Sequence, residues 1–373
     1  MRKLKDKIFD TMQSNTKIKV VFLVLATAVL GNSCKKIYNL PQEKDFISNN
    51  VNFSNKVLDP IIGRNNLLGN FNADYSTFPI NFEIVNARYG DGTPYTDIFK
   101  KVPTLVFIAP YTGLETSLAE IEAKRKVEER PMFEIRSSGQ FLLWGSSTND
   151  LIKPRPIDST NLSQDTRFFD VKITNTGGER LIRDFQIRPF RERPYEPSND
   201  FNAYTGLTAP DPQFPLDTTK RDYIRPYLDN VIGAVSDLPI SKYDKNDVVV
   251  YIRPFTGGNG HSLRIKVLNK DSTEINPNQF NETVYEKMIH GFNMQKTDKY
   301  VQYDVAYPIP LAEVSTFYAP GGSRAKVQLK YSRLGQGGGR QVATIGLDFA
   351  IYRQGDWEIV FHFRNQNPKF TNE

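Results

Sequence analysis

The strongest constraint on the fold is a period-two alternation of apolar and polar residues near the end of the chain. It occupies four segments: 301–307, 325–331, 343–351 and 357–363. Because successive side chains of a strand point to opposite faces, this period predicts half-buried strands. Glycine-rich turns separate the segments, including Gly335–Gly339. Residues 221–373 are therefore expected to form an antiparallel β-sandwich of immunoglobulin-like type, with its last two strands paired as a hairpin across Gln354–Asp356.

Residues 51–198 predict a second β-sandwich of the same type. Residues 132–136 and 140–144 flank Gly139, a pattern typical of a hairpin. Strands at 169–173 and 181–187 are expected to pair around a glycine turn in the same way. The apolar run from Thr104 to Ala109 is expected to be a strand inside the core of this domain.

One short helical insert is predicted in this first domain, over residues 117–130. Ser117 and Glu120 have the spacing of a capping box, in which the serine and glutamate side chains bind free amides at the helix start. Glu120–Lys124 and Glu122–Lys126 have the i,i+4 spacing of helical ion pairs. Pro131 would end the helix.

The two domains are separated by a segment dense in proline. Between 189 and 220 the prolines are Pro189, Pro194, Pro197, Pro210, Pro212 and Pro215. Proline lacks a backbone donor and fixes φ, so this density excludes a regular helix or a central strand. Residues 199–220 are interpreted as a linker, with a long loop packed across both domains as the alternative.

An export signal is expected at the beginning of the chain. The apolar run from Val20 to Gly31 follows Lys17 and Lys19, as in a signal peptide, and is too short to span a bilayer. Cys34, the single cysteine of the chain, stands where a bacterial lipobox places its lipidated residue. Residues 1–33 are therefore predicted to be a lipoprotein signal peptide, beginning at Met1 or Met12, and residues 34–50 a tether. The alternative for a lone cysteine is a small buried side chain.

Charge and composition exclude several classes of function. Residues 1–33 hold six of the 48 basic and two of the 42 acidic residues, which leaves 42 and 40 in the mature chain. This balance gives no electrostatic basis for nucleic-acid binding. No two of the three histidines have metal-ligand spacing, so no metal and no cofactor are expected. No catalytic motif stands out, and a hydrolase is the function with the least support.

Ligand binding by a β-sandwich would depend on exposed aromatic side chains, which have apolar faces for sugar C–H groups. The candidates are Trp144, Tyr195, Tyr204 and Tyr318. Trp144 ends a predicted hairpin, two of the tyrosines lie in the proline-dense segment, and Tyr318 precedes a Pro-Gly-Gly turn. For each of them, packing in a core or between domains is the alternative interpretation.

Four blocks of sequence carry a resemblance to a known family. They are Ser33-Cys34-Lys35-Lys36, Phe71–Pro79, Tyr111–Arg125 and Arg188–Pro197. Together they resemble an uncharacterised family of Bacteroidota outer-membrane lipoproteins, a domain of unknown function encoded near starch-utilisation-type importers. The resemblance implies an outer-membrane location, with the cell surface favoured over the periplasmic face. It carries over no active site and no ligand.

Three hypotheses follow for the function. The first is a lipid-anchored, non-catalytic binding or accessory subunit of a surface glycan-uptake system, whose partners are an importer complex and an extracellular glycan. The second is a structural or assembly partner of an outer-membrane complex that binds no small ligand. The third is a hydrolase. An exposed aromatic surface would favour the first, and a broad apolar patch would favour the second.

Overall fold

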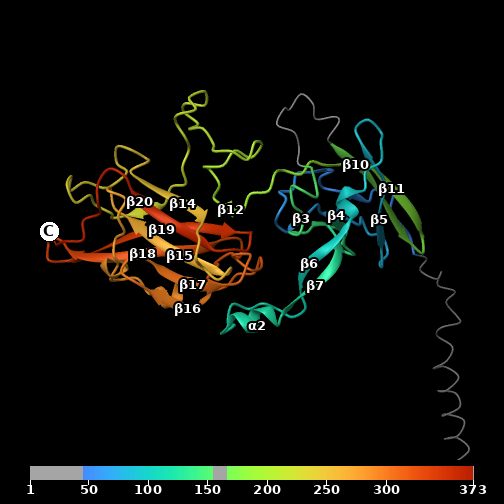
Figure 1. Ribbon diagram of the computed structural model, residues 1–373. Coiled ribbons are helices and arrows are strands. Elements are labelled where there is room, and N and C mark those ends of the chain that lie inside the picture. The colour runs from blue at the N-terminus through green and yellow to red at the C-terminus, as the bar shows by residue number, and fades with distance from the viewer. Residues whose placement is uncertain (1–44, 154–165, 373) are drawn as a thin grey trace, which may run out of the picture.

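The structure, a computed structural model, describes residues 45–153 and 166–372. Cys34 and most of the predicted tether lie outside these residues. The described chain is mainly β, as predicted, and α2 is the one α-helix in it. Two separate hydrophobic cores organise it into an N-terminal and a C-terminal unit, which stand side by side (Figure 1).

The C-terminal unit is a sandwich of two sheets. One contains β14 (Val248–Pro254), β20 (Trp357–Phe363), β15 (Ser262–Leu268), β17 (Val301–Val305) and β16 (Gly291–Lys296), in that spatial order. In the other, β19 (Arg340–Ile351) pairs with β18 (Ala325–Leu334) and with the short strands β12 (Tyr195–Glu196) and β13 (Tyr227–Asp229). The alternating apolar residues of β18 and β20 face the core, and Trp357 is buried among them, as predicted.

The predicted hairpin of the last two strands is wrong. β19 pairs with β18 in one sheet, whereas β20 lies between β14 and β15 in the other. Gln354–Asp356 thus carries the chain from one sheet to the other. Apolar alternation indicates which face of a strand is buried, but it does not identify the neighbouring strand. β20 is also parallel to β15, so the sandwich is not purely antiparallel.

The N-terminal unit is built on a four-stranded sheet: β2 (Val57–Leu58), β11 (Gly178–Ile187), β10 (Arg167–Asn175) and β5 (Asn81–Tyr89). The smaller elements are β1 (Asn52–Phe53), β3 (Asn66–Leu68), β4 (Phe71–Asn72), η1 (Asp97–Phe99), β8 (Phe133–Ile135) and β9 (Phe141–Leu143). The predicted hairpins β8–β9 and β10–β11 are both present. In the core, the ring of Phe141 lies 5.3–5.7 Å from four other phenylalanine rings.

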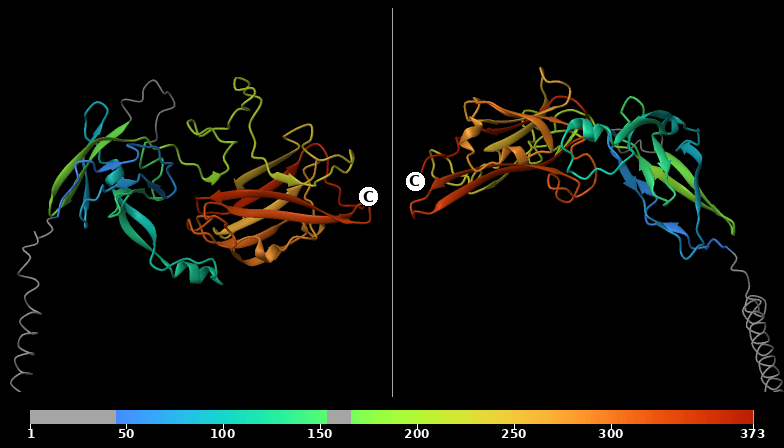
Figure 2. Two further views of the ribbon diagram at one scale, coloured as in Figure 1. Left: turned by 180° about the vertical axis from the view of Figure 1, so that it is seen from behind. Right: turned by 90° about the horizontal axis from the view of Figure 1, so that it is seen from below.

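A long arm, residues 101–131, leaves the N-terminal unit and ends against the C-terminal unit (Figures 1 and 2). It consists of β6 (Lys101–Phe107), α2 (Leu118–Glu122) and β7 (Arg125–Pro131), with β6 and β7 paired as a two-stranded ribbon. Thr104 is buried, but Leu105, Phe107 and Ile108 are 41–56% exposed. The expectation that this apolar run lies inside a core is therefore wrong, because only one face of the two-stranded ribbon is buried.

The helix predicted over 117–130 is much shorter than expected. Ser117 does cap it by accepting from the amide of Glu120, but the helix ends at Glu122. The predicted i,i+4 ion pairs are absent among the described residues, since Lys124 pairs with Glu115 and Lys126 with Glu128. Residues 125–131 instead satisfy their backbone groups by pairing with β6, and this long-range pairing outweighs the local helical preference.

A second contact between the units lies where the proline-dense segment begins. Arg64 of the N-terminal unit forms an ion pair with Glu196 at 2.9 Å, and its guanidinium lies 4.3 Å from the ring centre of Tyr352. β12 already belongs to the C-terminal sheet. The interpreted linker 199–220 contains a bridge between Phe201 and Thr208, and its Pro210 forms a bridge with Arg221 just beyond it. This stretch is therefore folded into loops.

Candidate functional site

The four aromatic residues proposed from the sequence lie apart from one another. The indole N–H of Trp144 donates to Glu134 within its own hairpin. Tyr195 packs edge-on against Trp357, and its hydroxyl donates to Asp200 at 3.0 Å. Tyr204 is 43% exposed and contacts Phe190. These three side chains do not combine into one surface.

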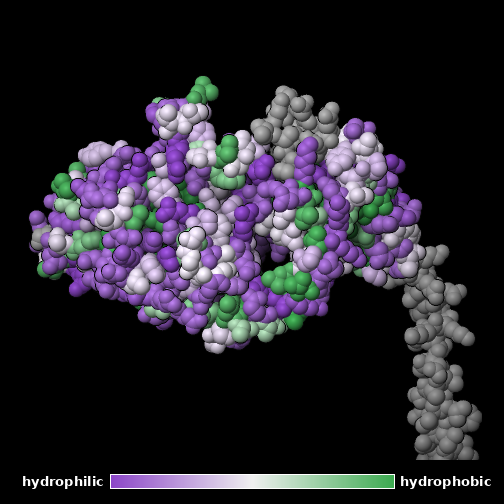
Figure 3. Space-filling model, in the orientation of Figure 1, coloured by the Kyte–Doolittle hydropathy of each residue, from purple (hydrophilic) through white to green (hydrophobic). Residues whose placement is uncertain are grey.

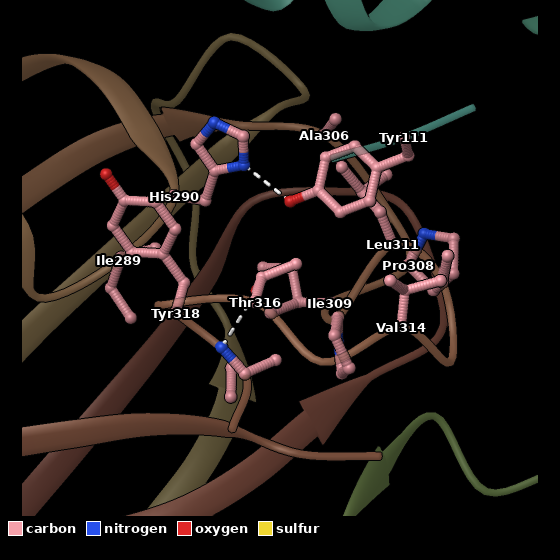
Figure 4. A pocket seen from close by; sticks show the side chains of 14 residues that line it. Tyr111, Ile289, His290, Ala306, Pro308, Ile309, Leu311, Val314, Thr316 and Tyr318 are labelled. Carbon is pink, nitrogen blue, oxygen red and sulfur yellow. Dashed lines mark hydrogen bonds between the residues drawn. The ribbon is translucent and has the colours of Figure 1, made fainter. Parts of the chain in front are cut away.

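Tyr318 lies in a contact between the arm and the C-terminal unit, here called the joint and formed by residues 111–125, 289–292 and 306–319 (Figure 4). The ring of Tyr318 stacks on His290 at 4.8 Å with an interplanar angle of 3°. The hydroxyl of Tyr111 donates to Nδ1 of His290 at 2.5 Å. Nε2 of His290 is 2.9 Å from the carbonyl of Glu115, and a carbonyl can only accept, so Nε2 carries the proton.

The polar groups of the arm are bonded within the joint. The buried carboxylate of Glu115 accepts from the amides of Thr112 and Gly113 and pairs with Lys124. Burial alone would raise the pKa of Glu115, but the hydrogen bonds from Lys124 and Thr112 lower it to about 2. Burial beside the Glu115 charge also raises the pKa of Tyr111, which keeps its hydroxyl protonated. The tip of the arm is thus held in shape by a charged side chain that stays ionised, while the backbone carbonyl of Glu115 makes the bond to His290 of the C-terminal unit.

The joint leaves almost no room for a ligand. Its cavity measures about 20 Å³, which is space for about one water molecule. Gly113 is packed so closely that an added Cβ would lie 2.8 Å from Cβ of Thr316. The joint therefore connects the two units, and Tyr318 contributes to that contact.

A larger hollow opens elsewhere on the C-terminal unit, here called the cleft. Its volume is about 730 Å³, within the range of small-molecule sites. Its lining residues come from three segments: residues 211–223, residues 241–246 and Arg364, which follows β20. The first segment stands out from the C-terminal unit as a yellow-green loop in Figure 1.

Two buried aspartates hold the cleft loops in place. The carboxylate of Asp247 accepts from the amide of Ser241 and from the side chain of Asn365, and its carbonyl accepts from the amide of Arg364. Asp211 accepts from the amide of Gln213 and lies 3.7 Å from the ammonium of Lys245. These bonds connect all three segments, so hydrogen bonds and an ion pair between the loops hold the cleft in its shape.

The cleft presents aromatic faces and cationic groups to solvent. Tyr243 is 81% exposed and Phe214 is 46% exposed. The ammonium of Lys220 lies 3.3 Å from the ring centre of Phe214, a cation–π arrangement that fixes both side chains. Such a surface can bind a ligand that has apolar faces and hydrogen-bond acceptors.

Comparison with known proteins identifies the family. A family described as Domain of unknown function (DUF5007) matches residues 71–372. The chain belongs to this family. No curated protein and no solved structure matches it. The DUF5007 match spans both units and includes the arm, the joint and the cleft, so all three lie within the region that defines the family.

The cleft of this DUF5007 chain was not predicted from the sequence. Phe214 and Lys220 lay in the segment interpreted as a linker, and Tyr243 lay in a polar loop outside any alternating pattern. The available signal was the number of basic and aromatic residues at 214–223 and 242–245. Within the described ranges, no three His, Cys, Asp or Glu side chains are placed to hold a metal ion. None of the helices described has both the length and the apolar character needed to cross a membrane.

Proposed function

We propose that this protein is a lipid-anchored, non-catalytic glycan-binding subunit that serves a nutrient-uptake system at the outer surface of the outer membrane. The cleft supports this proposal most directly, because Tyr243 and Phe214 expose aromatic faces beside polar groups in a hollow of about 730 Å³. Aromatic faces suit the C–H surfaces of sugar rings. The resemblance to Bacteroidota lipoproteins adds the importer complex as the partner.

The lipid anchor is proposed at Cys34, on the basis of the sequence. The first described residues belong to the N-terminal unit, where Asp45 bonds with Thr176. An anchor at Cys34 would therefore attach to the unit that does not carry the cleft. Metabolic labelling with a fatty acid tests this proposal: the native chain should incorporate the label and Cys34→Ser should not. Equal labelling of both chains would disprove the anchor at this residue.

Glycan binding is tested on the chain from residue 34 onward, made with Cys34→Ser to avoid lipidation. Electrophoresis through gels containing different polysaccharides should show retardation by at least one of them. Tyr243→Ala and Phe214→Ala should each reduce that retardation. The matched control is Tyr75→Ala, because Tyr75 is 92% exposed but lies in the N-terminal unit. Retardation that is unchanged in the cleft variants would exclude the cleft as the binding site.

A second function, as an assembly partner, is favoured by the exposed face of the arm. Leu105 and Val127 are cross-strand neighbours, 43% and 66% exposed, and Phe107 follows on the same face. Figure 3 shows hydrophobic surface over this ribbon. Affinity capture from native outer membranes, comparing the native chain with Leu105→Ser/Val127→Ser, tests this role. Loss of the importer from the variant alone would support docking through the ribbon.

A further inference from the structure

The charges that line the cleft are strongly unbalanced. Five of the lining side chains are cationic: Lys220, Arg221, Lys242, Lys245 and Arg364. Two are acidic, Asp211 and Asp244, so the cleft has a formal excess of three positive charges. The predicted mature chain as a whole has an excess of only two. Lys220 pairs with Asp217 at 3.9 Å, just outside the lining. The excess therefore comes from the remaining cations, which would attract an anion.

Both acidic groups of the cleft are already used by their own loops. Asp211 accepts from the amide of Gln213 and pairs with Lys245. Asp244 accepts from the amide of Asn246 through its carboxylate, and its carbonyl accepts from the amide of Asp247. These bonds shape the loops, and only Lys245 gains an acidic partner from them inside the cleft.

Three of the cations have no carboxylate within ion-pair distance among the described residues: Arg221, Lys242 and Arg364. Nε of Arg221 is also buried without a hydrogen-bond acceptor. Asp200 is close enough for the charge of Arg221 to oppose the rise in its pKa that burial causes, but its carboxylate bonds with Tyr195. Each of the three cations therefore keeps hydrogen-bond donors that the protein does not satisfy.

Two of these cations share one aromatic ring. The guanidinium carbon of Arg221 lies 4.7 Å from the ring centre of Tyr223, and that of Arg364 lies 5.0 Å from the same centre. Two positive groups brought to one ring repel each other. The ring stabilises each of them by a cation–π contact, but it supplies no negative charge. A bound anion would remove this repulsion and satisfy the free donors.

From this arrangement we propose that the cleft selects an anionic polysaccharide, with Arg221, Lys242 and Arg364 binding its carboxylate or sulfate groups and Tyr243 contacting a sugar face. This inference rests on the proposed function and specifies the class of glycan. Guanidinium groups bind both carboxylate and sulfate-like oxygens through paired donors. Carboxylated and sulfated sugars therefore belong to the same recognition chemistry.

The experiment measures binding to three polymers by titration calorimetry: polygalacturonate, dextran sulfate and neutral dextran. It uses the chain from residue 34 with Cys34→Ser, at two salt concentrations. The test variant is Lys242→Gln/Arg364→Gln. The control, Lys270→Gln/Lys299→Gln, removes the same charge from two exposed lysines of the C-terminal unit that do not line the cleft.

The expected result is binding to polygalacturonate or dextran sulfate that weakens as salt rises. The test variant should lose about tenfold or more in affinity, because each charge-assisted hydrogen bond is stronger than a neutral one, and the control should stay within about twofold. The anionic polymer that binds more tightly then shows whether the cleft recognises carboxylate or sulfate groups.

Several results would overturn the inference. Binding to neutral dextran that is insensitive to salt and to the test variant would leave glycan binding intact but exclude anion selection. Equal affinity for duplex DNA, or binding to anionic lipid vesicles but to neither acidic polymer, would show that the cleft does not select a sugar. Binding to no polymer here, together with no retardation by any polysaccharide, would reject the proposed function itself.

Discussion

In the joint, Tyr111 and His290 bond with each other across the two units, whereas in the cleft three cationic side chains have no carboxylate partner in the part of the chain that the structure describes. His290 has bonding partners from the arm at both ring nitrogens, and Glu115 binds two amides and a lysine of the arm itself. Arg221 and Arg364 contact Tyr223 but form no ion pair with a carboxylate of residues 45–153 or 166–372. Burial and complete bonding indicate a structural contact, while cations that share a hollow without carboxylate partners are available to an anionic ligand.

This comparison predicts that substitutions in the joint change the free energy that holds the arm in place, and that substitutions in the cleft do not. Because the protein has two cores, a single unfolding transition would not report on the arm. Hydrogen exchange of amides in the arm measures its local opening directly.

The largest effect is expected for Gly113→Ala. Gly113 has φ +78°, a conformation that costs other residues about 1–2 kcal/mol. Its new Cβ would also lie 2.8 Å from Cβ of Thr316, and such overpacking costs about 1–3 kcal/mol. The free energy of arm opening should fall by about 2–5 kcal/mol in total, seen as faster exchange over 111–125.

The matched control is Gly92→Ala. Gly92 has φ +87° but no atom within 4 Å of an added Cβ. Gly92→Ala should therefore lose only the free energy of the unfavourable backbone conformation, and exchange should become faster only in its own loop. If both variants left the exchange of the arm equally protected, Gly113 would not be packed against Thr316 in solution.

A smaller effect, of about 1.5–3 kcal/mol at pH 7, is expected for Glu115→Gln, because the carboxylate accepts charge-assisted hydrogen bonds in a buried site. The pKa of Glu115 is about 2 in the folded protein, below its model-compound value of 4.5. Its contribution is therefore present above about pH 4.5 and is lost as the pH falls toward 2. Arm protection factors, corrected for intrinsic exchange, should converge between the native chain and the variant over that window.

Glu120→Gln is the control for this pH dependence. Glu120 is exposed and accepts from the amide and hydroxyl of Thr116, outside the buried part of the joint. It should change arm opening by less than about 1 kcal/mol. Convergence at low pH in this variant as well would point to a general acid effect and away from Glu115.

A third prediction separates two tyrosines of the joint. Tyr111→Phe removes the donor to Nδ1 of His290 and should weaken the arm contact by about 1 kcal/mol. Tyr318→Phe should have almost no effect, because Tyr318 contributes its ring to the stack on His290. Exchange of the arm amides in the two variants is the measurement. A larger loss from Tyr318→Phe would contradict the assignment of the hydroxyl bond to Tyr111.

The sequence predicted the β class, the hairpins β8–β9 and β10–β11 and the burial of Trp357, because these depend on local alternation and turn residues. It did not predict the pairing of β20 with β14 and β15, which is decided by contacts between distant segments. The helix predicted for the arm is too long for the same reason: the expected partner of Lys124 was Glu120, one turn away, but Lys124 pairs with Glu115 and residues 125–131 pair with β6.

The sites were predicted less well than the fold. Tyr318 was selected as an aromatic residue in a loop, and it does lie beside other aromatic groups, but in a closed contact. The cleft combines residues separated by more than 100 positions, with Arg364 beside Tyr223. No spacing rule along the chain links such residues, so only the folded structure brings them together.

The smallest effect on stability is expected in the cleft, where side chains are proposed to bind a ligand and not to hold the fold together. Tyr243 is 81% exposed, and its ring is contacted by Lys242 at 5.2 Å. Tyr243→Ala should therefore change the free energy of unfolding by no more than about 0.5 kcal/mol. It should still weaken the retardation of the protein in gels that contain the polysaccharide. A loss of more than about 1 kcal/mol in Tyr243→Ala would mean that the ring stabilises the loop, as expected of a packing residue. An unchanged melting temperature with lost binding would mean that its exposed face is kept for a ligand.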